Sequence, residues 1–420
     1  MKKIAIIGTG ISGMAAGYFL RKDYDITFFE KNDYPGGHTN TLMVDEDGTQ
    51  IPIDSAFMVY NEVTYPNLTH LFRELMVDTR DTDMSFSVQH LASGLDYCGT
   101  GLNGLFAQRR NILNLFHYKM LIDINRFNKE SLEVLESDQY LDWTIERYTR
   151  EKGYGQAMLY KYLIPMSSAV WSTPVEDMLN FPIITLVRFF KNHGFLGMNT
   201  QHQWRTVVGG SQQYKEKILA HFEGKVKLNT PIVAVRREKE GVKIKDDKDN
   251  VYEFDKVIMA SHADQTLNML VDATQEEKEV LGMFPYVANH ATLHTDASIM
   301  PKTKGAWSSW NYRIRENEGK TETTTIYYMN KLQKVSEKKD YFVSINELGE
   351  VDPSKIIWER TYYHPLYTMD SIEGQKRLGA LNDNGQIYFA GAYFKYGFHE
   401  DGLTSGIDVA KKILGREVWS

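Results

Sequence analysis

The chain has 420 residues, of which 42% are hydrophobic and 25% are charged, and its formal net charge is −7. This length predicts two substantial domains, and the composition is that of an ordinary globular protein rather than a disordered or fibrous one. The negative charge and the absence of a long Lys/Arg run argue against a nucleic-acid-binding protein, and the single cysteine, Cys98, cannot form an internal disulfide.

The beginning of the chain has a short basic start and then an apolar stretch that reaches Leu20, a pattern that secretory leaders share. A glycine-rich motif from Gly8 to Gly13 lies inside this stretch, and cleavage behind it would remove the most informative motif of the sequence. We therefore expect a cytoplasmic protein. No other window holds about eighteen uninterrupted apolar residues, so we expect no membrane-spanning helix.

The N-terminal residues have the pattern of one βαβ unit. Residues 4–7 are apolar and predict a buried parallel strand, residues 11–22 predict the helix that follows, and residues 25–30 predict a second strand. By the handedness rule for parallel strands, the crossover between them should be right-handed.

Later parts of the chain change character several times. Residues 110–200 are rich in aromatic residues at helical spacing, whereas residues 225–260 form short alternating runs that predict strands. A mixed, β-rich stretch follows over 290–360. The C-terminus closes with a predicted strand at 386–390, a glycine-rich loop and a helix from about Leu403 to Leu414. Strands and helices thus share the chain, which predicts an α/β protein.

The motif Gly8-Thr9-Gly10-Ile11-Ser12-Gly13 lies between the first strand and its helix. The first glycine permits a tight turn, the second lets backbone approach a pyrophosphate, and the third lets helix and strand pack closely. The helix N-terminus adds N–H donors and positive dipole for the phosphate. Glu30, at the end of the next strand, is placed to accept ribose hydroxyls and disfavours a 2′-phosphate, so the motif predicts a dinucleotide other than NADP.

Two further motifs favour FAD over NAD. Pro35-Gly36-Gly37-His38 provides a second pair of glycines where backbone can pass beside the pyrophosphate. Near the C-terminus, Tyr388–Gly391 and Gly397–Gly402 predict a strand, a bare turn and a helix N-terminus. That arrangement suits a flavin ring, because a helix dipole stabilises the anionic reduced flavin near its N1 and O2 atoms.

Together these motifs resemble those of the flavin-containing amine oxidase superfamily, which shares its FAD fold with glutathione reductase-type enzymes. The resemblance runs nearly end to end; Thr230–Val235 is similar to the strand that touches the adenine, and Ile258–His262 to the segment that returns toward the flavin. The motifs and the resemblance imply cofactor contacts at Gly8, Gly10, Ile11, Ser12, Gly13, Glu30, Lys31, Gly36, Gly37, His38, Thr39, Val233, Ala260, Gly391, Gly402 and Leu403.

Within that superfamily the chain more closely resembles a bacterial branch of predicted FAD-binding oxidoreductases. The shared segments include Gly36–Thr41, Asn61–Asn67, Asp83–Val88, Asn103–Arg110 and Trp171–Pro174. Members of the branch resemble the flavin domain fused to plant cyclopropane fatty-acid synthases, which implies a lipid-linked redox reaction. Two departures from the amine oxidases argue against an amine substrate: His38 stands where they carry Arg, and Ala392 follows Gly391 where they carry an acid.

The expected fold is therefore α/β: a two-dinucleotide-binding, glutathione reductase-like FAD fold with an inserted mixed helical and β substrate domain. We expect a discontinuous FAD domain made of residues 1–75, 200–288 and 365–420. The two insertions, residues 76–199 and 289–364, are expected to form the substrate domain.

Catalytic candidates are few, since the flavin itself carries the redox chemistry. His364, Tyr393 and Phe398 are candidates by position, and a core role is an open alternative for each. His38 could contact the pyrophosphate or tether the flavin covalently. We expect no metal site at His399-Glu400-Asp401, because three adjacent side chains cannot all face one ion, and we expect Asp401 to act as the N-cap of the last helix.

The aromatic insertion has two possible roles. Leu113, Phe116, Met120 and Ile124 have helix-like spacing, which predicts a common apolar face. The segment Leu179–Met198 could line an acyl pocket or touch a membrane surface, with a buried helix as the favoured alternative.

The favoured function is FAD-dependent hydride transfer from an apolar, fatty-acyl or lipid substrate. We expect no nucleic-acid partner and no membrane-spanning segment. Peripheral contact with a membrane or with a lipid-modifying enzyme is left open. Three alternatives remain: an amine oxidase that releases hydrogen peroxide, a flavin-dependent isomerase without net redox change, and a non-catalytic flavoprotein partner of a lipid-modifying methyltransferase.

Overall fold

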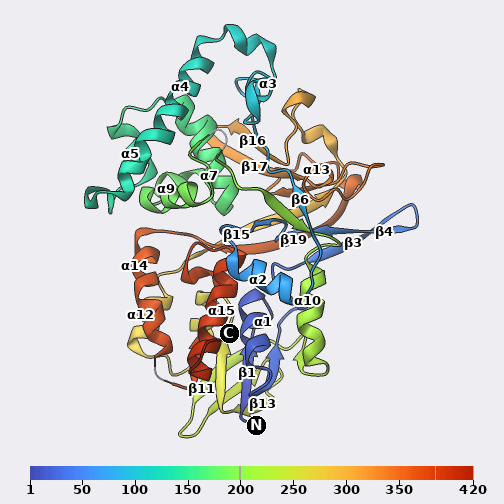
Figure 1. The fold of residues 1–420 in the computed structure, drawn as a ribbon, viewed down its shortest axis with the longest axis vertical. Helices are drawn as coiled ribbons and strands as arrows, with labels where there is room; N and C mark the ends of the chain where they lie inside the picture. The colour runs from blue at the N-terminus through green and yellow to red at the C-terminus, as the bar shows by residue number, and fades with distance from the viewer. Residues whose placement is uncertain (198–199, 384, 420) are drawn as a thin grey trace.

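The computed structural model describes residues 1–197, 200–383 and 385–419 (Figure 1). The lower half in Figure 1 is built on a five-stranded parallel sheet with the strand order β10-β2-β1-β14-β20. In that order the strands are Val226–Lys227, Asp25–Phe29, Lys3–Ile7, Lys256–Met259 and Ile387–Phe389. Strands that are buried on both faces are apolar throughout, which is why the sequence alone already predicted β1.

One face of this sheet is covered by α1 (Ile11–Leu20), α10 (Gln212–Leu219) and α15 (His399–Leu414). Ile4 and Ile6 of β1 join the apolar core on this side. α1 and α15 can approach closely because Gly406 has no side chain, and a Cβ there would lie 2.3 Å from the carbonyl oxygen of Ser12. The close contact brings the first and last helices of the chain together.

The other face is covered by a three-stranded antiparallel sheet and three helices. Ala5 and Ile7, the alternate residues of β1, join this second core together with Val235 and Phe284. The period of two in a strand thus lets β1 serve both cores. The covering elements are β11 (Ile232–Arg237), β12 (Val242–Asp246), β13 (Val251–Phe254), α11 (Ala263–Met269), α12 (Gln275–Leu281) and α14 (Met369–Leu378).

The upper half in Figure 1 contains a seven-stranded sheet with the order β19-β15-β18-β17-β16-β7-β8. Its neighbouring strands are antiparallel except for β16 and β7, which are parallel. In sheet order the strands are Ile356–Pro365, Tyr286–His294, Phe342–Ile345, Lys320–Tyr328, Trp310–Asn317, Phe86–His90 and Leu95–Cys98.

Smaller elements join the two halves. They are the hairpin β3 (Thr41–Glu46) and β4 (Thr49–Asp54), the short sheet β5 (Tyr60–Asn61), β9 (Trp204–Val207) and β6 (Thr79–Thr82), and the helices α2 (Pro66–Glu74) and α13 (Met329–Leu332).

A helical group beside the upper sheet has its own apolar core. In α9, the side chains of Ile183, Leu186 and Phe190 are fully buried, so this segment is a core helix; Met198, at the end of the predicted segment, lies outside the described residues. Among the described residues, no helix is both long and apolar enough to cross a membrane. The group comprises α3 (Gly101–Leu105), α4 (Leu115–Glu130), α5 (Ile145–Glu151), α6 (Gln156–Met158), α7 (Ile164–Trp171), α8 (Val175–Leu179) and α9 (Ile183–Asn192).

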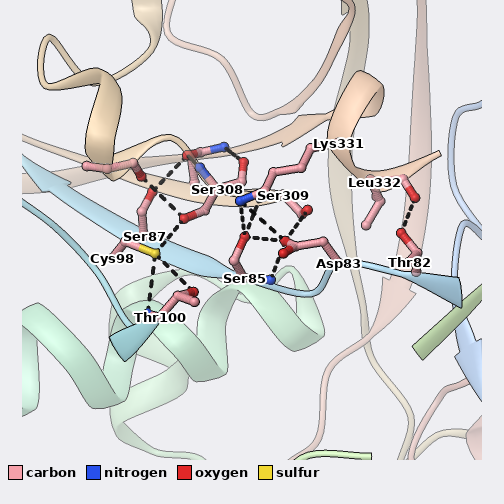
Figure 2. Close-up of polar contacts among 12 residues, drawn as sticks. Thr82, Asp83, Ser85, Ser87, Cys98, Thr100, Ser308, Ser309, Lys331 and Leu332 are labelled. Atoms are coloured by element: carbon pink, nitrogen blue, oxygen red, sulfur yellow. Dashed lines mark hydrogen bonds and ion pairs between the residues drawn. The ribbon is translucent and has the colours of Figure 1, made fainter. Parts of the chain in front are cut away.

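The parallel pair β7 and β16 is fastened by polar side chains (Figure 2). The Asp83 carboxylate accepts hydrogen bonds from the Ser85 backbone N–H at 2.8 Å and from the Ser309 hydroxyl at 2.7 Å. Ser85 Oγ accepts from the Ser309 N–H at 3.1 Å and from Lys331 Nζ at 2.9 Å. The Asp83–Val88 motif therefore has a structural role at this seam.

The last helix begins earlier than predicted, and the prediction that Asp401 is its N-cap is wrong. α15 starts at His399, with Phe398 at the N-cap position. Asp401 lies in the first turn, where its carboxylate accepts hydrogen bonds from the backbone N–H groups of Phe398 at 3.0 Å and Tyr396 at 3.1 Å. By reaching back to the preceding loop, this side chain lets the helix start four residues before Leu403.

The predicted apolar face of residues 113–124 forms only in part. Met120 is buried, but the side chains of Leu113 and Phe116 are 89% and 82% exposed. Leu113 belongs to a 3-10 turn, Arg109–Leu113, that precedes α4, so it does not follow the helical period. Helical spacing therefore predicted a shared buried face, whereas the structure covers Met120 and leaves Leu113 and Phe116 exposed.

Candidate functional site

A cavity of about 940 Å³ lies between the parallel sheet and the upper sheet, and its walls come from segments throughout the chain. One end, which we call the glycine end, is formed by Gly8, Gly10 and Gly37 together with Glu30 and Val233. The other end, which we call the aromatic chamber, is lined by Met84, Phe86, Met166, Val170, Trp171, Phe189, Trp310, Tyr327 and Phe398. This size lies within the usual range for pockets that bind small molecules and cofactors.

The turn after β1 has almost no room for side chains. Gly8 has a φ of +104°, and a Cβ there would lie 2.5 Å from the carbonyl oxygen of Ala260. A Cβ on Gly13 would lie 2.1 Å from the carbonyl oxygen of Gly8. A Cβ on Gly10, by contrast, would meet no protein atom within 4 Å, because this residue faces the open cavity. The protein thus needs Gly8 and Gly13 for its own packing, whereas bare backbone at Gly10 serves a ligand in the cavity.

Glu30 organises the glycine end. It is 5% exposed, and one carboxylate oxygen accepts hydrogen bonds from Thr9 N at 3.1 Å and Thr9 Oγ1 at 2.6 Å. The other oxygen accepts from Asn32 N at 3.0 Å and Asn32 Nδ2 at 2.8 Å. Thr9 Oγ1 in turn accepts from Gly36 N at 3.0 Å. One buried carboxylate therefore joins both glycine motifs while still lining the cavity.

Val233 lies at an irregularity of β11. The strand register shifts between Ile232, which pairs with Asp246, and Ala234, which pairs with Lys245. Val233 thus has no residue opposite it in the ladder, and it lines the cavity. A bulge of this kind leaves backbone groups free for another partner, as an adenine contact would require.

Four partly buried histidines surround the middle of the cavity. The ring of His38 lies 5.1 Å from that of His364, His262 stacks on Tyr286 at 4.4 Å, and His399 stacks on Phe57 at 3.8 Å between ring centroids. Burial lowers the pKa of His38 to about 4 and the pKa values of the other three, His262, His364 and His399, to about 3. All four imidazoles are accordingly neutral near pH 7.

Hydrogen bonds fix the tautomer of His364. The amide oxygen of Asn289 accepts from Asn346 Nδ2 at 2.8 Å, so the amide nitrogen of Asn289 faces His364 Nδ1, at 3.0 Å. Nδ1 is then the acceptor, and Nε2 carries the proton. This geometry makes His364 a hydrogen-bond donor rather than a proton acceptor.

Polar atoms in the cavity wall are left without partners. His38 Nε2, Trp310 Nε1 and Tyr393 Oη are buried and have no hydrogen-bond partner among the described residues. Buried polar atoms of this kind are rarely left without a partner in folded proteins. Together with the open space at Gly10, they fit a large polar and aromatic ligand such as a flavin dinucleotide.

The aromatic chamber is walled by packed rings. Phe189 lies 4.8 Å from Phe398 with the rings nearly parallel, and 4.7 Å from Trp171. The indole N–H of Trp171 donates to the carbonyl oxygen of Tyr396 at 3.1 Å, which ties α7 to the loop before α15. Among the described residues that line the cavity, Glu30 is the only acidic one, and it lies at the glycine end.

The structure brings most of the predicted contacts into one cavity. The predicted residues that line it are Gly8, Gly10, Ile11, Ser12, Glu30, Lys31, Gly37, His38, Val233, Ala260 and Gly391, with the catalytic candidates His364, Tyr393 and Phe398. The remaining five lie behind this wall: Gly13, Gly36, Thr39, Gly402 and Leu403. Thr39, for example, is fully buried and hydrogen-bonds to Tyr214.

Sequence reasoning missed several residues of the wall. Tyr362 hydrogen-bonds through its hydroxyl to Ser55 Oγ at 2.7 Å and Asn40 Nδ2 at 3.0 Å, and it stands beside His38. Ser55 follows the last residue of β4, and polar residues just after a strand are a signal that could have been used. Tyr327 and Trp310 carried no local signal, because they belong to ordinary alternating strands.

Comparison with known proteins agrees with this geometry. The family model described as flavin containing amine oxidoreductase matches residues 11–414. A putrescine oxidase bound to putrescine has a similar structure, with a TM-score of 0.68 and 15% identity over 99% of both chains. A CLA-producing fatty acid isomerase from P. acnes has a TM-score of 0.68 and 14% identity over 98% of this chain and 97% of its own.

A 1-hydroxycarotenoid 3,4-desaturase from Flavobacterium sp. is 51% identical over 43 residues, which are 10% of this chain and 9% of the desaturase. The structural likenesses concern the fold alone, since the identities are low. The family match covers nearly the whole chain. The protein therefore belongs to the flavin-containing amine oxidoreductase family: it is an oxidoreductase with an α/β, two-dinucleotide-binding fold, and its cofactor is FAD.

Proposed function

We propose that this oxidoreductase removes a hydride from an apolar substrate, a fatty-acyl chain or a lipid that carries one. The observation that carries the proposal is the composition of the aromatic chamber. Its wall consists of aromatic, methionine and aliphatic side chains, and the only acid among the described lining residues is engaged at the opposite end.

A cationic amine would need a carboxylate or an aromatic cage. The described wall of the chamber offers a cation aromatic rings but no carboxylate, whereas an apolar chain gains free energy along the whole of such a wall by leaving water. The resemblance to the flavin domain of plant cyclopropane fatty-acid synthases supports the same substrate class.

We further propose that FAD lies with its pyrophosphate along Gly10 and Gly37 and its adenine near Val233. In support, these residues line one end of the cavity, and the N-terminus of α1 directs its unpaired N–H groups there. Gly13, Gly36, Thr39, Gly402 and Leu403 would then support the contact residues from behind.

The same proposal divides the chain as the motifs suggest. Residues 1–75, 200–288 and 365–420 hold all five strands of the parallel sheet, which supports a discontinuous FAD domain. Residues 76–199 and 289–364 hold the helical group and most of the upper sheet, which supports a substrate domain.

When bound, FAD supplies the hydride acceptor, so oxidation of a saturated carbon pair gives a carbon–carbon double bond and releases one proton. The chain's share is to position the substrate and exclude water. Phe189 and Trp171 would hold the apolar chain, while the N-terminus of α15, at His399, supplies positive dipole toward developing negative charge. The N–H of His364 is a second donor at the same wall.

The test is anaerobic. Oxidised holoprotein is mixed with phospholipids or fatty acids in one series and with primary amines and polyamines in another, and bleaching of the flavin absorbance is followed. We expect bleaching by a member of the acyl series. Rapid bleaching by amines alone, with release of hydrogen peroxide in air, would instead identify an amine oxidase. A change in double-bond position without lasting bleaching would identify an isomerase.

A further inference from the structure

A cluster of exposed apolar side chains lies on α3, on the 3-10 turn after it and at the start of α4. Figure 1 shows these elements at the end of the molecule opposite the N-terminus. We call this cluster the apolar tip; it consists of Leu102, Ile112, Leu113, Leu115, Phe116, Tyr118 and Ile122. These are seven of the eighteen exposed large hydrophobic residues in the described chain, and they fall within one short segment. Single exposed apolar residues are ordinary, but a contiguous group marks an interaction surface.

The tip is held rigidly rather than exposed by fraying. Asn114 caps α4, since its side-chain oxygen accepts hydrogen bonds from Phe116 N at 3.1 Å and His117 N at 3.4 Å. Within α4, His117 and Met120 are buried, and His117 Nε2 lies 2.9 Å from the carbonyl oxygen of Leu105 on α3. These contacts fix α4 so that Leu115 and Phe116 face solvent, with exposures of 81% and 82%.

The charges around the tip differ in sign from the charge of the whole chain. Residues 97–129 contain Arg109, Arg110, Lys119, Arg126 and Lys129, and their only acid is Asp123. Asp123 is buried, where it accepts from the Gly155 N–H at 3.1 Å and pairs with Arg126 at 3.5 Å. Arg109 donates to the carbonyl oxygen of Phe106, and Arg110 to that of Gly94. Arg126 also pairs with Glu130, at the end of α4, at 3.4 Å, whereas within the described chain Arg109, Arg110, Lys119 and Lys129 form no ion pair with a carboxylate.

From this combination we infer that the tip docks on the surface of an anionic phospholipid bilayer. Apolar side chains beside unpaired Lys and Arg, with no exposed acid over residues 102–129, match the two layers of such a surface, which are acyl chains inside and negative headgroups outside. A second copy of the chain would bring the same positive charges face to face, which disfavours self-association. The segment is far too short to span a bilayer, so the contact is peripheral.

The tip is also connected to the cavity through packing. Met120, on the buried face of α4, shares an apolar cluster with Ala169 of α7. Met166 and Val170 of the same helix line the aromatic chamber. The docked surface is therefore separated from the chamber by one layer of helices. The docking inference rests on the tip alone and does not depend on the proposed substrate.

The experiment is co-sedimentation of the full-length holoprotein with vesicles of phosphatidylcholine, or of phosphatidylcholine mixed with phosphatidylglycerol. We expect binding to the anionic vesicles only, and loss of binding at about 1 M NaCl, where the Debye length falls to about 3 Å. Leu115→Glu and Phe116→Glu should each weaken binding about tenfold, since each removes one inserted apolar side chain. Replacing Arg109, Arg110 and Lys119 together by Ala should weaken it at least as much.

The matched control is Leu141→Glu, which introduces the same charge at a leucine that is 55% exposed outside the tip. It should bind like the parent, and all variants should keep their flavin absorbance and melting temperature. The inference is overturned if the parent fails to bind anionic vesicles, or if the tip variants bind as well as Leu141→Glu. It is equally overturned if the parent is a dimer that Phe116→Glu dissociates without any effect on vesicle binding.

Discussion

The two ends of the cavity are built from different materials. At the glycine end the wall is backbone, held in place by close approaches such as Gly13 to Gly8 and by the hydrogen bonds of Glu30. In the aromatic chamber the wall is side chains, which come from α7, α9, β16, β17 and the loop before α15. A backbone wall recognises a shape that many proteins share, whereas a side-chain wall can change residue by residue. The comparison predicts that cofactor binding is sensitive to single substitutions and that the chamber sets the substrate.

The largest effect is expected from Gly10→Val. Gly10 has a φ of −61°, which any residue can adopt, and its Cβ would meet no protein atom within 4 Å. The variant should therefore fold, but its side chain would fill the space that the pyrophosphate needs. We expect FAD affinity to fall by at least about a hundredfold, measured by titrating apoprotein with FAD.

The control for this variant is Gly379→Val, where a Cβ also meets nothing within 4 Å but the residue lies away from the cavity. It should bind FAD like the parent. Equal FAD affinity in Gly10→Val and the parent would show that the cofactor lies elsewhere.

A smaller effect on the same end is expected from Glu30→Ala. Removing the carboxylate leaves donors of Thr9 and Asn32 without their acceptor and removes a charged acceptor for the ribose. We expect FAD to bind more weakly by about 1.5–3 kcal/mol, with a lower melting temperature as well. Glu30→Gln, which keeps the shape, should recover part of the stability but little of the affinity. An unchanged dissociation constant in both variants would contradict the assignment.

In the chamber, Val170→Asp should impair substrate turnover without impairing cofactor binding. The new carboxylate would face an apolar wall, so we expect kcat/KM for the acyl substrate to fall about tenfold to a hundredfold while FAD stays bound. Val170→Ala, which removes volume without charge, should have a smaller effect. If Val170→Asp instead improved turnover of an amine, the chamber would accommodate a cation and the acyl proposal would fail.

The smallest effect on cofactor binding and turnover is expected at the start of α15, where the consequence is for stability instead. Burial raises the pKa of Asp401 from its usual value to about 7. Because the folded protein then holds this proton more tightly than the unfolded chain does, its contribution to stability is present at low pH and is lost as the pH rises from about 4 to about 7. The loss can reach about 1.4 kcal/mol for each pH unit in this window.

Asp401→Asn cannot titrate, so its free energy of unfolding should lack this dependence. As the pH rises from about 4 to about 7, we expect the free energy of unfolding of the parent to fall relative to that of the variant. Urea unfolding at several pH values measures this difference. Parallel pH profiles would mean that Asp401 has an ordinary pKa.

The glycine end was largely predictable because its requirements are local. Gly8, Gly10 and Gly13 stand at fixed spacings after an apolar strand, and the steric reasons for each act within a few residues or against the adjacent strand β14. The strands β1, β14 and β20 of the parallel sheet were predicted for the same reason, since each is a short apolar run that is buried over most of its length. This information survives in a single sequence.

The chamber and the tip were decided by tertiary structure. Helical spacing puts Phe116 and Met120 on one side of α4, but only the position of α3 and α7 determines that Met120 is covered and Phe116 is not. Likewise Tyr327 became a wall residue because β17 lies under the cavity, and α15 began at His399 because Asp401 reaches the preceding loop. In each case the deciding contact either joins residues far apart in the chain or involves a loop, where the sequence has no periodic pattern. No local sequence pattern therefore specifies that contact.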